Sequence, residues 1–410
     1  MADFTKRNGI VTANIVNMSG IQKATRSKFN NQSLPLGTAC RWIAGDGNGW
    51  MYMTDAGGAG SGWTSIVDYG TGLAKDLAYG KDSSGANRWV IGATMANNGI
   101  IYADAGLTDL TNASNWTSVD IEFDGKDMTA VDGGPAIAWG DTTTDSSMWI
   151  SGGIKVDETS TGDETSIKRS TNGGTTWSAV NPADLPDLNA SYTRTMVFAG
   201  GDTWFAGNQN DVWKSTNNGA TWIYGRENIS NDIYSMASGS DAAAGSPSKP
   251  NLWVTVGNQG AINWSDDDWA TSSIATDSRN SGPFHNVPGG GGANNHKATG
   301  VVYAAGTINR WVAVSKSAPD GGSGLLSPVI AYSTDGDNWT AATITGYTGT
   351  DDIWCVATDN TTIVAAGTGG KIFTSTDGET FTVQTAPNSP SPDVAPSFRS
   401  IACDVLIWEG

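Results

Sequence analysis

The residues with the clearest potential for metal chemistry are the two histidines, His285 and His296, which both lie in the glycine-rich segment 282–297. Zinc needs three or four nitrogen, sulfur or carboxylate ligands held at a fixed geometry. The segment offers two histidines eleven residues apart and no cysteine. We therefore interpret both as solvent-exposed loop residues, and we expect neither a bound metal nor another cofactor.

Carboxylates are the other groups that could do chemistry, because the chain has 35 Asp and 6 Glu, which sum to its 41 acidic residues. A glycosidase needs two of them about 5–10 Å apart across a sugar bond, and so many turn aspartates leave this alternative open. The run Gly45–Gly49 resembles part of a calcium loop, but the bidentate Glu is missing, so it predicts a hairpin turn. The sequence contains no nucleophile elbow, Walker motif or dinucleotide motif.

The charge balance argues against two classes of partner. The formal net charge is −18 and the pI is about 4.3, so nucleic-acid phosphates and anionic lipids would repel the chain. The start, Met1–Arg7, lacks the apolar core of a signal peptide, and no stretch approaches 18 apolar residues. We expect a protein made in a cytoplasm, without nucleic-acid or membrane partners.

The elements that must position these groups are strands. Gly 53 and Trp 18 are high counts, as in proteins built from tight turns and sheet-on-sheet cores. Asp, a turn former, far outnumbers Glu, a helix former, and no sustained helical stripe of apolar residues is present. The three cysteines, Cys40, Cys355 and Cys403, fit small buried residues of strands better than a disulfide framework.

A four-strand unit recurs along the chain. Its last copy contains strands at Ile353–Thr358, Thr362–Gly367, Lys371–Thr376 and Phe381–Thr385. Each copy ends in an aromatic residue after a polar turn, and these residues are Trp63, Trp116, Trp177, Trp222, Trp269, Trp339 and Phe381. Repetition at this spacing predicts a single all-β propeller of four-stranded antiparallel blades that occupies residues 1–410.

The turn between the third and fourth strands has a shared pattern. A Ser is followed by an Asp or Asn, which closes the turn on backbone N–H groups, then by a Gly, which tolerates positive φ, and by an aromatic residue that fills the gap beneath. The copy that ends at Trp269 is interpreted as shortened. The turn residues are Ser170, Asn172, Gly174 and Trp177; Ser215, Asn217, Gly219 and Trp222; Ser265, Asp267 and Trp269; Ser333, Asp335 and Trp339; and Ser375, Asp377 and Phe381.

The chain ends predict how the ring closes. The tail, 397–410, is similar to the first two strands of a unit, and the head, within 1–36, contains a candidate third strand at Asn8–Asn14. A blade made from both ends would be an eighth blade. If the tail instead completes the first unit, Arg41–Ile66, the ring has seven blades, which we favour. Either arrangement removes the open edges.

Long insertions indicate where function could lie. In a propeller, loops between the second and third strands and between blades open on one face. Five of six long insertions fall in these classes: Gly153–Ser166, Ser317–Ser327, Pro182–Tyr192, Ile274–Lys297 and Ala386–Ser397. Long loops on a rigid scaffold often bind partners. The candidate binding residues on this rim are Asp157, Glu158, Phe284, His285, His296 and Asp320.

The turns resemble the Asp-box, Ser-x-Asp-x-Gly-x-Thr-Trp, of sialidases, photosystem-assembly propellers, sortilin-type receptors and some xyloglucan hydrolases. The resemblance implies a propeller in which these turns are structural and lie away from the ligand face. It does not extend to sialidase catalysis, because the chain lacks the Arg-Ile-Pro motif and its arginines, such as Arg41, Arg88 and Arg310, mostly precede a strand tryptophan.

Composition and the degenerate repeats together resemble bacteriophage structural proteins. This resemblance implies a non-enzymatic tail, neck, fibre or capsid-decoration component of a virion, present in several copies and bound to other virion proteins. A host surface glycan is a further candidate partner. The alternatives are a carbohydrate-binding or glycoside-hydrolysing propeller and a bacterial complex-assembly factor.

Overall fold

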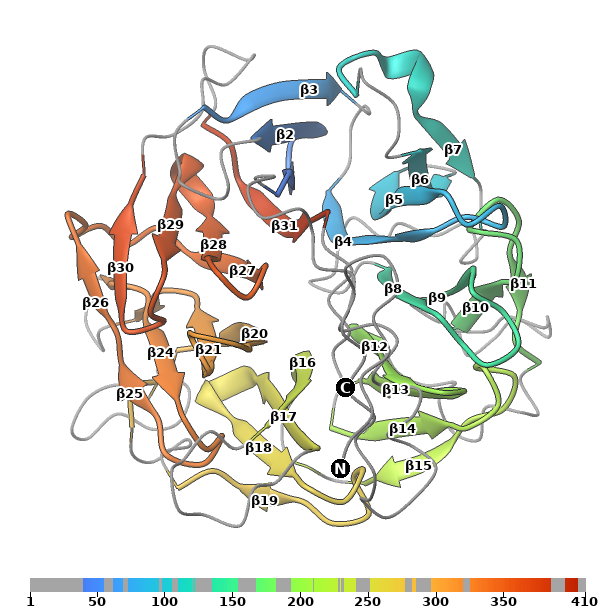
Figure 1. The fold of residues 1–410 in the computed structure, drawn as a ribbon. Coiled ribbons are helices and arrows are strands. Elements are labelled where there is room, and N and C mark those ends of the chain that lie inside the picture. The colour runs from blue at the N-terminus through green and yellow to red at the C-terminus, as the bar shows by residue number, and fades with distance from the viewer. Residues whose placement is uncertain are drawn as a thin grey trace, which may run out of the picture. The chain divides into compact units, whose positions relative to one another are not determined.

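The computed structural model describes residues 40–54, 62–68, 73–95, 98–104, 110–119, 121, 135–153, 167–181, 193–208, 210–227, 229, 232–240, 251–276, 282–284, 296–319, 325–384 and 395–404. Residues Cys40–Gly410 form one compact unit. Within it, seven sheets follow one another around a common axis (Figure 1). The predicted all-β propeller is confirmed, and it has seven four-stranded blades.

Each blade runs from an outermost strand to an innermost strand at the axis. In this order, the first three blades contain β3 (Thr64–Asp68), β2 (Trp50–Thr54), β1 (Trp42–Asp46) and β31 (Phe398–Cys403); β7 (Thr117–Val119), β6 (Asn98–Asp104), β5 (Asn87–Met95) and β4 (Ala74–Lys81); and β11 (Ser178–Ala179), β10 (Ile167–Ser170), β9 (Met148–Gly152) and β8 (Ala136–Gly140).

The remaining four blades have the same order. They contain β15 (Ile223–Arg226), β14 (Val212–Ser215), β13 (Thr203–Gly207) and β12 (Thr195–Gly200); β19 (Ser273–Ile274), β18 (Ile262–Ser265), β17 (Leu252–Gly257) and β16 (Ile233–Gly239); β25 (Thr340–Ala341), β24 (Ile330–Ser333), β21 (Arg310–Ser315) and β20 (Ala298–Ala304); and β30 (Thr380–Val383), β29 (Ile372–Ser375), β28 (Ile363–Gly367) and β27 (Ile353–Thr358).

The C-terminal strand closes the ring inside the first blade. β31 pairs antiparallel with β1, with Cys403 opposite Trp42. Asp404 fixes its end, because its Oδ1 accepts the N–H of Arg41 at 2.8 Å and its own N–H donates to the Arg41 carbonyl at 2.9 Å. The tail therefore completes the first unit, as favoured for seven blades. The segment 1–36, with its candidate strand, lies outside the described residues.

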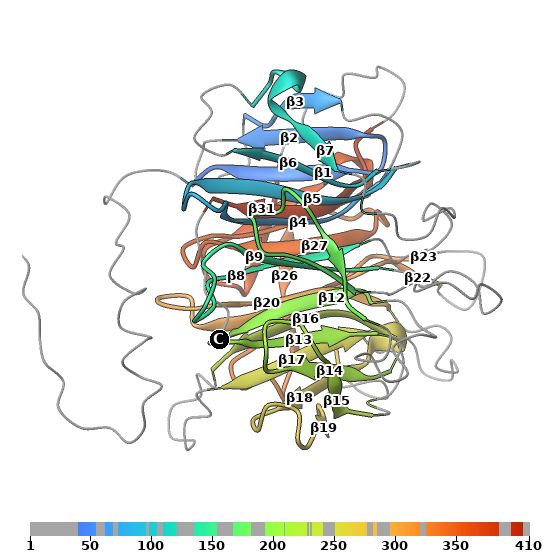
Figure 2. The same cartoon turned by 90° about the vertical axis from the view of Figure 1, so that its right-hand side faces the viewer.

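Two short pairings were not predicted. β26 (Thr343–Thr345) leaves the sixth blade and pairs parallel with β30 of the seventh, so these two blades are linked at their outer edge. β22 (Ala318–Pro319) and β23 (Leu325–Leu326) form a hairpin between β21 and β24. Figure 2 shows this hairpin extending from one side of the stacked blades.

Tryptophans and the repeat aromatics form the contacts between blades. Trp222 of the fourth blade packs in one cluster with Met148 and Ile150 of the third. Trp339 of the sixth packs in the same way with Leu252 of the fifth. Trp63 of the first shares a cluster with strands of the seventh, which continues the pattern through the closure. Burying such large aromatic surfaces is the main stabilising contribution between the sheets.

The Ser-x-Asx turns, as we call the polar turns before these aromatics, have a repeated hydrogen-bond pattern. In the fourth blade the Ser215 Oγ donates to Asn217 Oδ1 at 3.0 Å and accepts the Gly219 N–H at 2.9 Å. Asn217 Oδ1 accepts the Thr221 N–H at 2.9 Å, and the indole of Trp222 donates to the Gly219 carbonyl at 3.0 Å. The serine and Asx contacts recur in the turns that start at Ser170, Ser333 and Ser375.

The turn of the fifth blade corrects the sequence interpretation. It is not shortened: the Asp267 Oδ1 accepts the Thr271 N–H at 2.8 Å, as Asn217 does with Thr221. Trp269 stands at the glycine position, with φ of 66° and its N–H donated to Ser265 Oγ at 2.9 Å. Its side chain is fully buried against Phe205 and Val212 of the preceding blade. Trp269 thus fills the gap between its blade and the preceding one from a position three residues before the one that Trp222 occupies in its turn.

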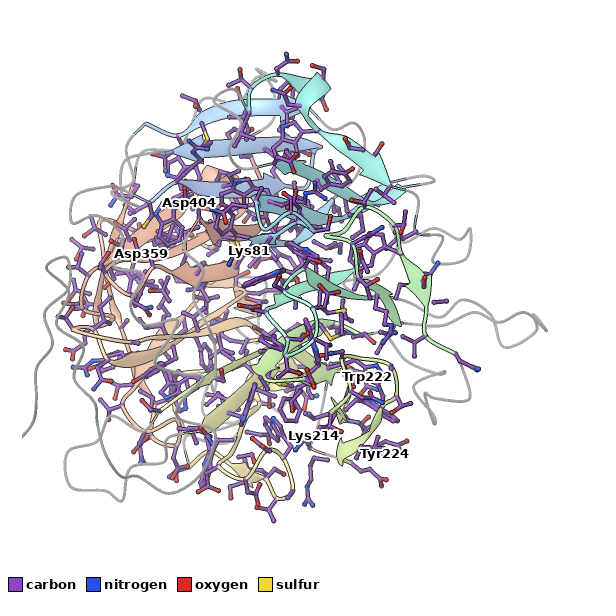
Figure 3. The ribbon with its side chains drawn as sticks, turned by 45° about the vertical axis from the view of Figure 1, so that its right-hand side comes forward. Lys81, Lys214, Trp222, Tyr224, Asp359 and Asp404 are labelled. Carbon is purple, nitrogen blue, oxygen red and sulfur yellow. The ribbon has the colours of Figure 1, made fainter. Side chains whose placement is uncertain are left out.

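Polar contacts connect each Ser-x-Asx turn to the preceding blade. Arg88 of the second blade donates to the Gly173 carbonyl at 2.6 Å and is 6% exposed. Lys214 of the fourth, labelled in Figure 3, lies 3.6 Å from Asp268 of the fifth. Arg310 of the sixth pairs with Glu379 of the seventh. Arg88 and Arg310, which each precede a strand tryptophan, therefore contribute to ring assembly.

Candidate binding face

The topology separates two faces of the propeller. The turn face carries the Ser-x-Asx turns and the loops between the first and second strands. The insertion face carries the loops between the second and third strands and those between blades, and the strands that flank the five predicted insertions are connected at this face. Of the candidate rim residues, Asp157, Glu158, His285 and Asp320 lie outside the described residues.

The structure corrects the interpretation of the other two rim candidates, Phe284 and His296, which are buried at 0% and 4% exposure. Phe284 packs in the cluster between the fifth and sixth blades, against the tight turn at Gly260. The His296 N–H donates to the Phe284 carbonyl at 3.1 Å, and its Nδ1 lies 2.8 Å from the Lys316 carbonyl. These residues hold the base of the insertion and are not contact residues.

A bulge recurs where the inner strands begin. In five of the seven, the pairing register with the second strand shifts by one residue at the insertion-face end. Bulges redirect a side chain and are frequent beside functional sites. The extra residues are Lys75, Tyr234, Thr299, Trp354 and Arg399.

Trp354 is the centre of a group of charged side chains on this face. The Arg399 guanidinium of the first blade lies 3.8 Å from the centre of its ring, and the Lys316 ammonium of the sixth blade lies 4.1 Å from it. Lys316 is also 3.7 Å from a carboxylate oxygen of Asp352. Asp352 in turn accepts the N–H and hydroxyl of Ser317 at 3.0 and 2.7 Å. We call Lys316, Asp352, Trp354 and Arg399 the Trp354 cluster.

A smaller version of this arrangement lies two blades away. Arg194, at the start of the fourth inner strand, is 4.8 Å from the ring of Tyr234 and 3.7 Å from an oxygen of Asp232. The sequences Asp232-Ile233-Tyr234 and Asp352-Ile353-Trp354 are therefore structural equivalents. Their repetition at the start of an inner strand was a signal that could have identified both groups from the sequence.

Asp76, next to the bulge residue Lys75, links the second and third blades. Its two carboxylate oxygens accept the N–H groups of Leu77 and Ile137, each at 2.9 Å. Burial raises its pKa to about 7, although these hydrogen bonds act in the opposite direction. A carboxyl held by two backbone donors is a positioning group for neighbouring strands.

The described residues contain no group of three or more His, Cys, Asp or Glu side chains placed to hold a metal ion. In the run Gly45–Gly49, Asp46 is buried and accepts the N–H groups of Asn48 and Trp50 at 2.8 Å, as in the predicted turn. No helix in the described part of the chain has the length and apolarity to cross a membrane.

Comparisons support the fold. No family model and no curated protein matches the sequence. The GH74 xyloglucanase from Xanthomonas campestris is similar, with a TM-score of 0.58 and 14% identity over 85% of this chain and 53% of that one. The chain thus spans about half the length of that enzyme. YCF48 from Cyanidioschyzon merolae has a TM-score of 0.46 and 12% identity over 78% and 86% of the two chains. At 14% identity the likeness to the xyloglucanase shows the propeller fold alone.

Proposed function

We propose that this protein is a non-enzymatic binding propeller of a bacteriophage virion, which docks to other virion proteins through its insertion face. The observation that carries the proposal is the asymmetry of the scaffold. Five of six predicted long insertions connect strands at one face, and five of the six inner-strand bulges lie at that face, whereas the Ser-x-Asx turns on the other face make internal contacts. The Asp-box resemblance agrees with a structural role for those turns.

The virion assignment is tested by locating the protein. An antibody raised against the propeller should label purified phage particles in immunogold electron microscopy, and the chain should remain with the particles through density-gradient centrifugation. Absence of the label from particles whose host cells contain the protein would contradict the virion role.

The insertion face is tested by shortening one loop. Because the His296 N–H already bonds to the Phe284 carbonyl, replacing residues 285–295 with Asn-Gly makes that bond the closing bond of a β-turn. We expect an unchanged melting temperature and at least tenfold weaker docking to particles. The matched control replaces residues 241–250, on the turn face between β16 and β17, with the same dipeptide. Equal docking by both variants would contradict an insertion-face contact.

A second candidate function is carbohydrate binding or hydrolysis, which the fold similarity to the xyloglucanase favours. Incubation with xyloglucan should then release reducing sugars or retard the protein in affinity electrophoresis. The virion proposal expects neither result.

A further inference from the structure

We propose that the Trp354 cluster is the docking centre of the insertion face and that it takes an acidic segment of the partner protein. The inference rests on the proposed function, since it names the chemistry of the same face. It begins from geometry: the cluster draws residues from three consecutive blades, with Lys316 from the sixth, Asp352 and Trp354 from the seventh, and Arg399 from the first.

Three of the five predicted insertions begin or end beside this cluster. The insertion 317–327 follows Lys316 directly. The insertion 274–297 is joined to the same residue, because His296 Nδ1 contacts the Lys316 carbonyl and the Lys316 N–H donates to the Lys297 carbonyl at 2.9 Å. The insertion 386–397 ends two residues before Arg399. The described ends of three insertions therefore lie beside the cluster.

The side chains of the cluster suit a binding centre. Tryptophan and arginine are the residues most often found at energetic hot spots, where a rigid ring and a planar cation meet a partner in a partly desolvated site. Lys316 and Asp352 retain side-chain exposures of 24% and 22%, so their polar groups remain within reach of a partner. The bulges at Trp354 and Arg399 hold both side chains at the ends of rigid strands rather than in loops.

The charge distribution selects an acidic partner. The Trp354 cluster holds two cationic groups against one indole ring and one carboxylate, Asp352, in a protein whose net charge is −18. Many other described carboxylates lie on the turn face, including Asp266, Asp267, Asp268, Asp335, Asp337, Asp377 and Glu379. Complementary charge mainly sets orientation and specificity in docking. An acidic segment would thus be repelled by the turn face and directed to the Trp354 cluster.

Fluorescence anisotropy of fluorescein-labelled hexaglutamate tests the proposal with the full chain. We choose 0.1 M salt because the Debye length is then about 10 Å, so distant carboxylates are screened while local contacts persist. Lys316→Gln and Arg399→Gln should each weaken binding at least fivefold, and the double variant at least twentyfold. Raising the salt concentration to 0.5 M should also weaken the binding of hexaglutamate to the wild type.

Matched controls exist on the turn face. Lys214 lies 5.4 Å from the ring of Phe205 and 3.6 Å from Asp268, with 23% exposure, so it repeats the setting of Lys316. Arg310 lies 5.8 Å from the ring of Tyr332 and pairs with Glu379. Lys214→Gln and Arg310→Gln should bind hexaglutamate within twofold of the wild type.

Three outcomes would overturn the inference: no binding of hexaglutamate, equal losses in the turn-face controls, or tighter binding of hexalysine. These outcomes are separable from failure of the proposed function. If the loop-shortened variant loses particle docking while the Lys316 and Arg399 variants keep it, the insertion face stands and the cluster does not. If particles carry no antibody label, the virion role fails whatever the peptide result.

Discussion

Trp269 has a backbone conformation that glycine adopts more easily, with φ of 66°, yet its side chain is fully buried. Strain of this kind costs about 1–3 kcal/mol, and the buried ring offsets it. The aligned turn of the fourth blade has Gly219 at this position and its tryptophan three residues later, where the fifth blade has Ser272. Each gap between neighbouring blades therefore needs one aromatic ring, but the position in the turn that supplies this ring varies.

A two-site exchange tests this equivalence. Trp269→Gly should lower the apparent melting temperature, because losing a buried tryptophan costs about 3–5 kcal/mol and exceeds the strain released. Ser272→Trp alone should also be destabilising, since two rings would then compete for one gap. The double variant should recover most of the loss, as measured by differential scanning fluorimetry. Additive losses in the double variant would show that the two positions do not serve the same gap.

At the residue scale, the sequence was informative wherever chemistry and spacing coincide. Ser, Asx, Gly and aromatic residues predicted four of the five turns correctly. The fifth failed because the aromatic residue was assumed to end the turn, and a tryptophan at positive φ is not an expected choice. His296 was also misread, because burial in a glycine-rich segment depends on the blade against which it packs, which the sequence does not reveal.

At the scale of the elements, polar contacts between blades differ in how much they contribute to stability. Arg88 is 6% exposed, and its guanidinium bonds to Asp104 at 2.8 Å and to the Gly173 carbonyl at 2.6 Å. Arg310 makes a similar contact with Glu379, but its side chain is 26% exposed. Solvent therefore competes more with the contact between Arg310 and Glu379 than with the contact between Arg88 and the Gly173 carbonyl.

Replacing each arginine by methionine, which keeps the apolar stem, should separate these cases. We expect Arg88→Met to cost about 1–3 kcal/mol, because it leaves the buried Gly173 carbonyl without the donor that links the second blade to the third. Arg310→Met should cost about 0–1 kcal/mol, the range of a partly exposed ion pair. The measurement is the shift in urea midpoint for each variant. Similar shifts in the two variants would mean that burial does not determine how much these contacts stabilise the protein.

The strand order was predictable because four-strand units repeat, and the tail could be assigned to the first blade from its missing inner strand. The inner-strand bulges were not predicted, since a single extra residue leaves the alternation of a short strand almost unchanged. β26 was missed for a related reason: three residues that pair with the next blade carry no periodic signal. The Trp354 cluster depends on those bulges, so the candidate site was located to a face but not to its residues.

For the whole propeller, the pKa shifts predict the direction of its pH dependence. Asp76 has a pKa raised to about 7 by burial, so between about 4 and 7 the folded state holds a proton that the unfolded state has lost. Its contribution to stability therefore falls as the pH rises through this window. His296 has a pKa lowered by burial, so its contribution falls as the pH drops below about 6.5. The lowered pKa values of the turn aspartates Asp267, Asp335 and Asp377 contribute stability that is lost on further acidification, below about 4.

Asp76→Asn isolates the first of these effects while keeping the carboxamide oxygen as an acceptor for one backbone N–H. In the wild type, the apparent melting temperature should fall between pH 6.5 and pH 7.5, above the range in which His296 acts in the opposite direction, since both ionisation of Asp76 and repulsion within a chain of net charge −18 increase. The variant should show a smaller fall over the same interval, measured in 0.15 M salt. Salt screens the long-range repulsion between exposed groups but not a buried carboxyl. A fall that disappears at 1 M salt and is the same in both proteins would therefore assign the pH dependence to net charge and not to Asp76.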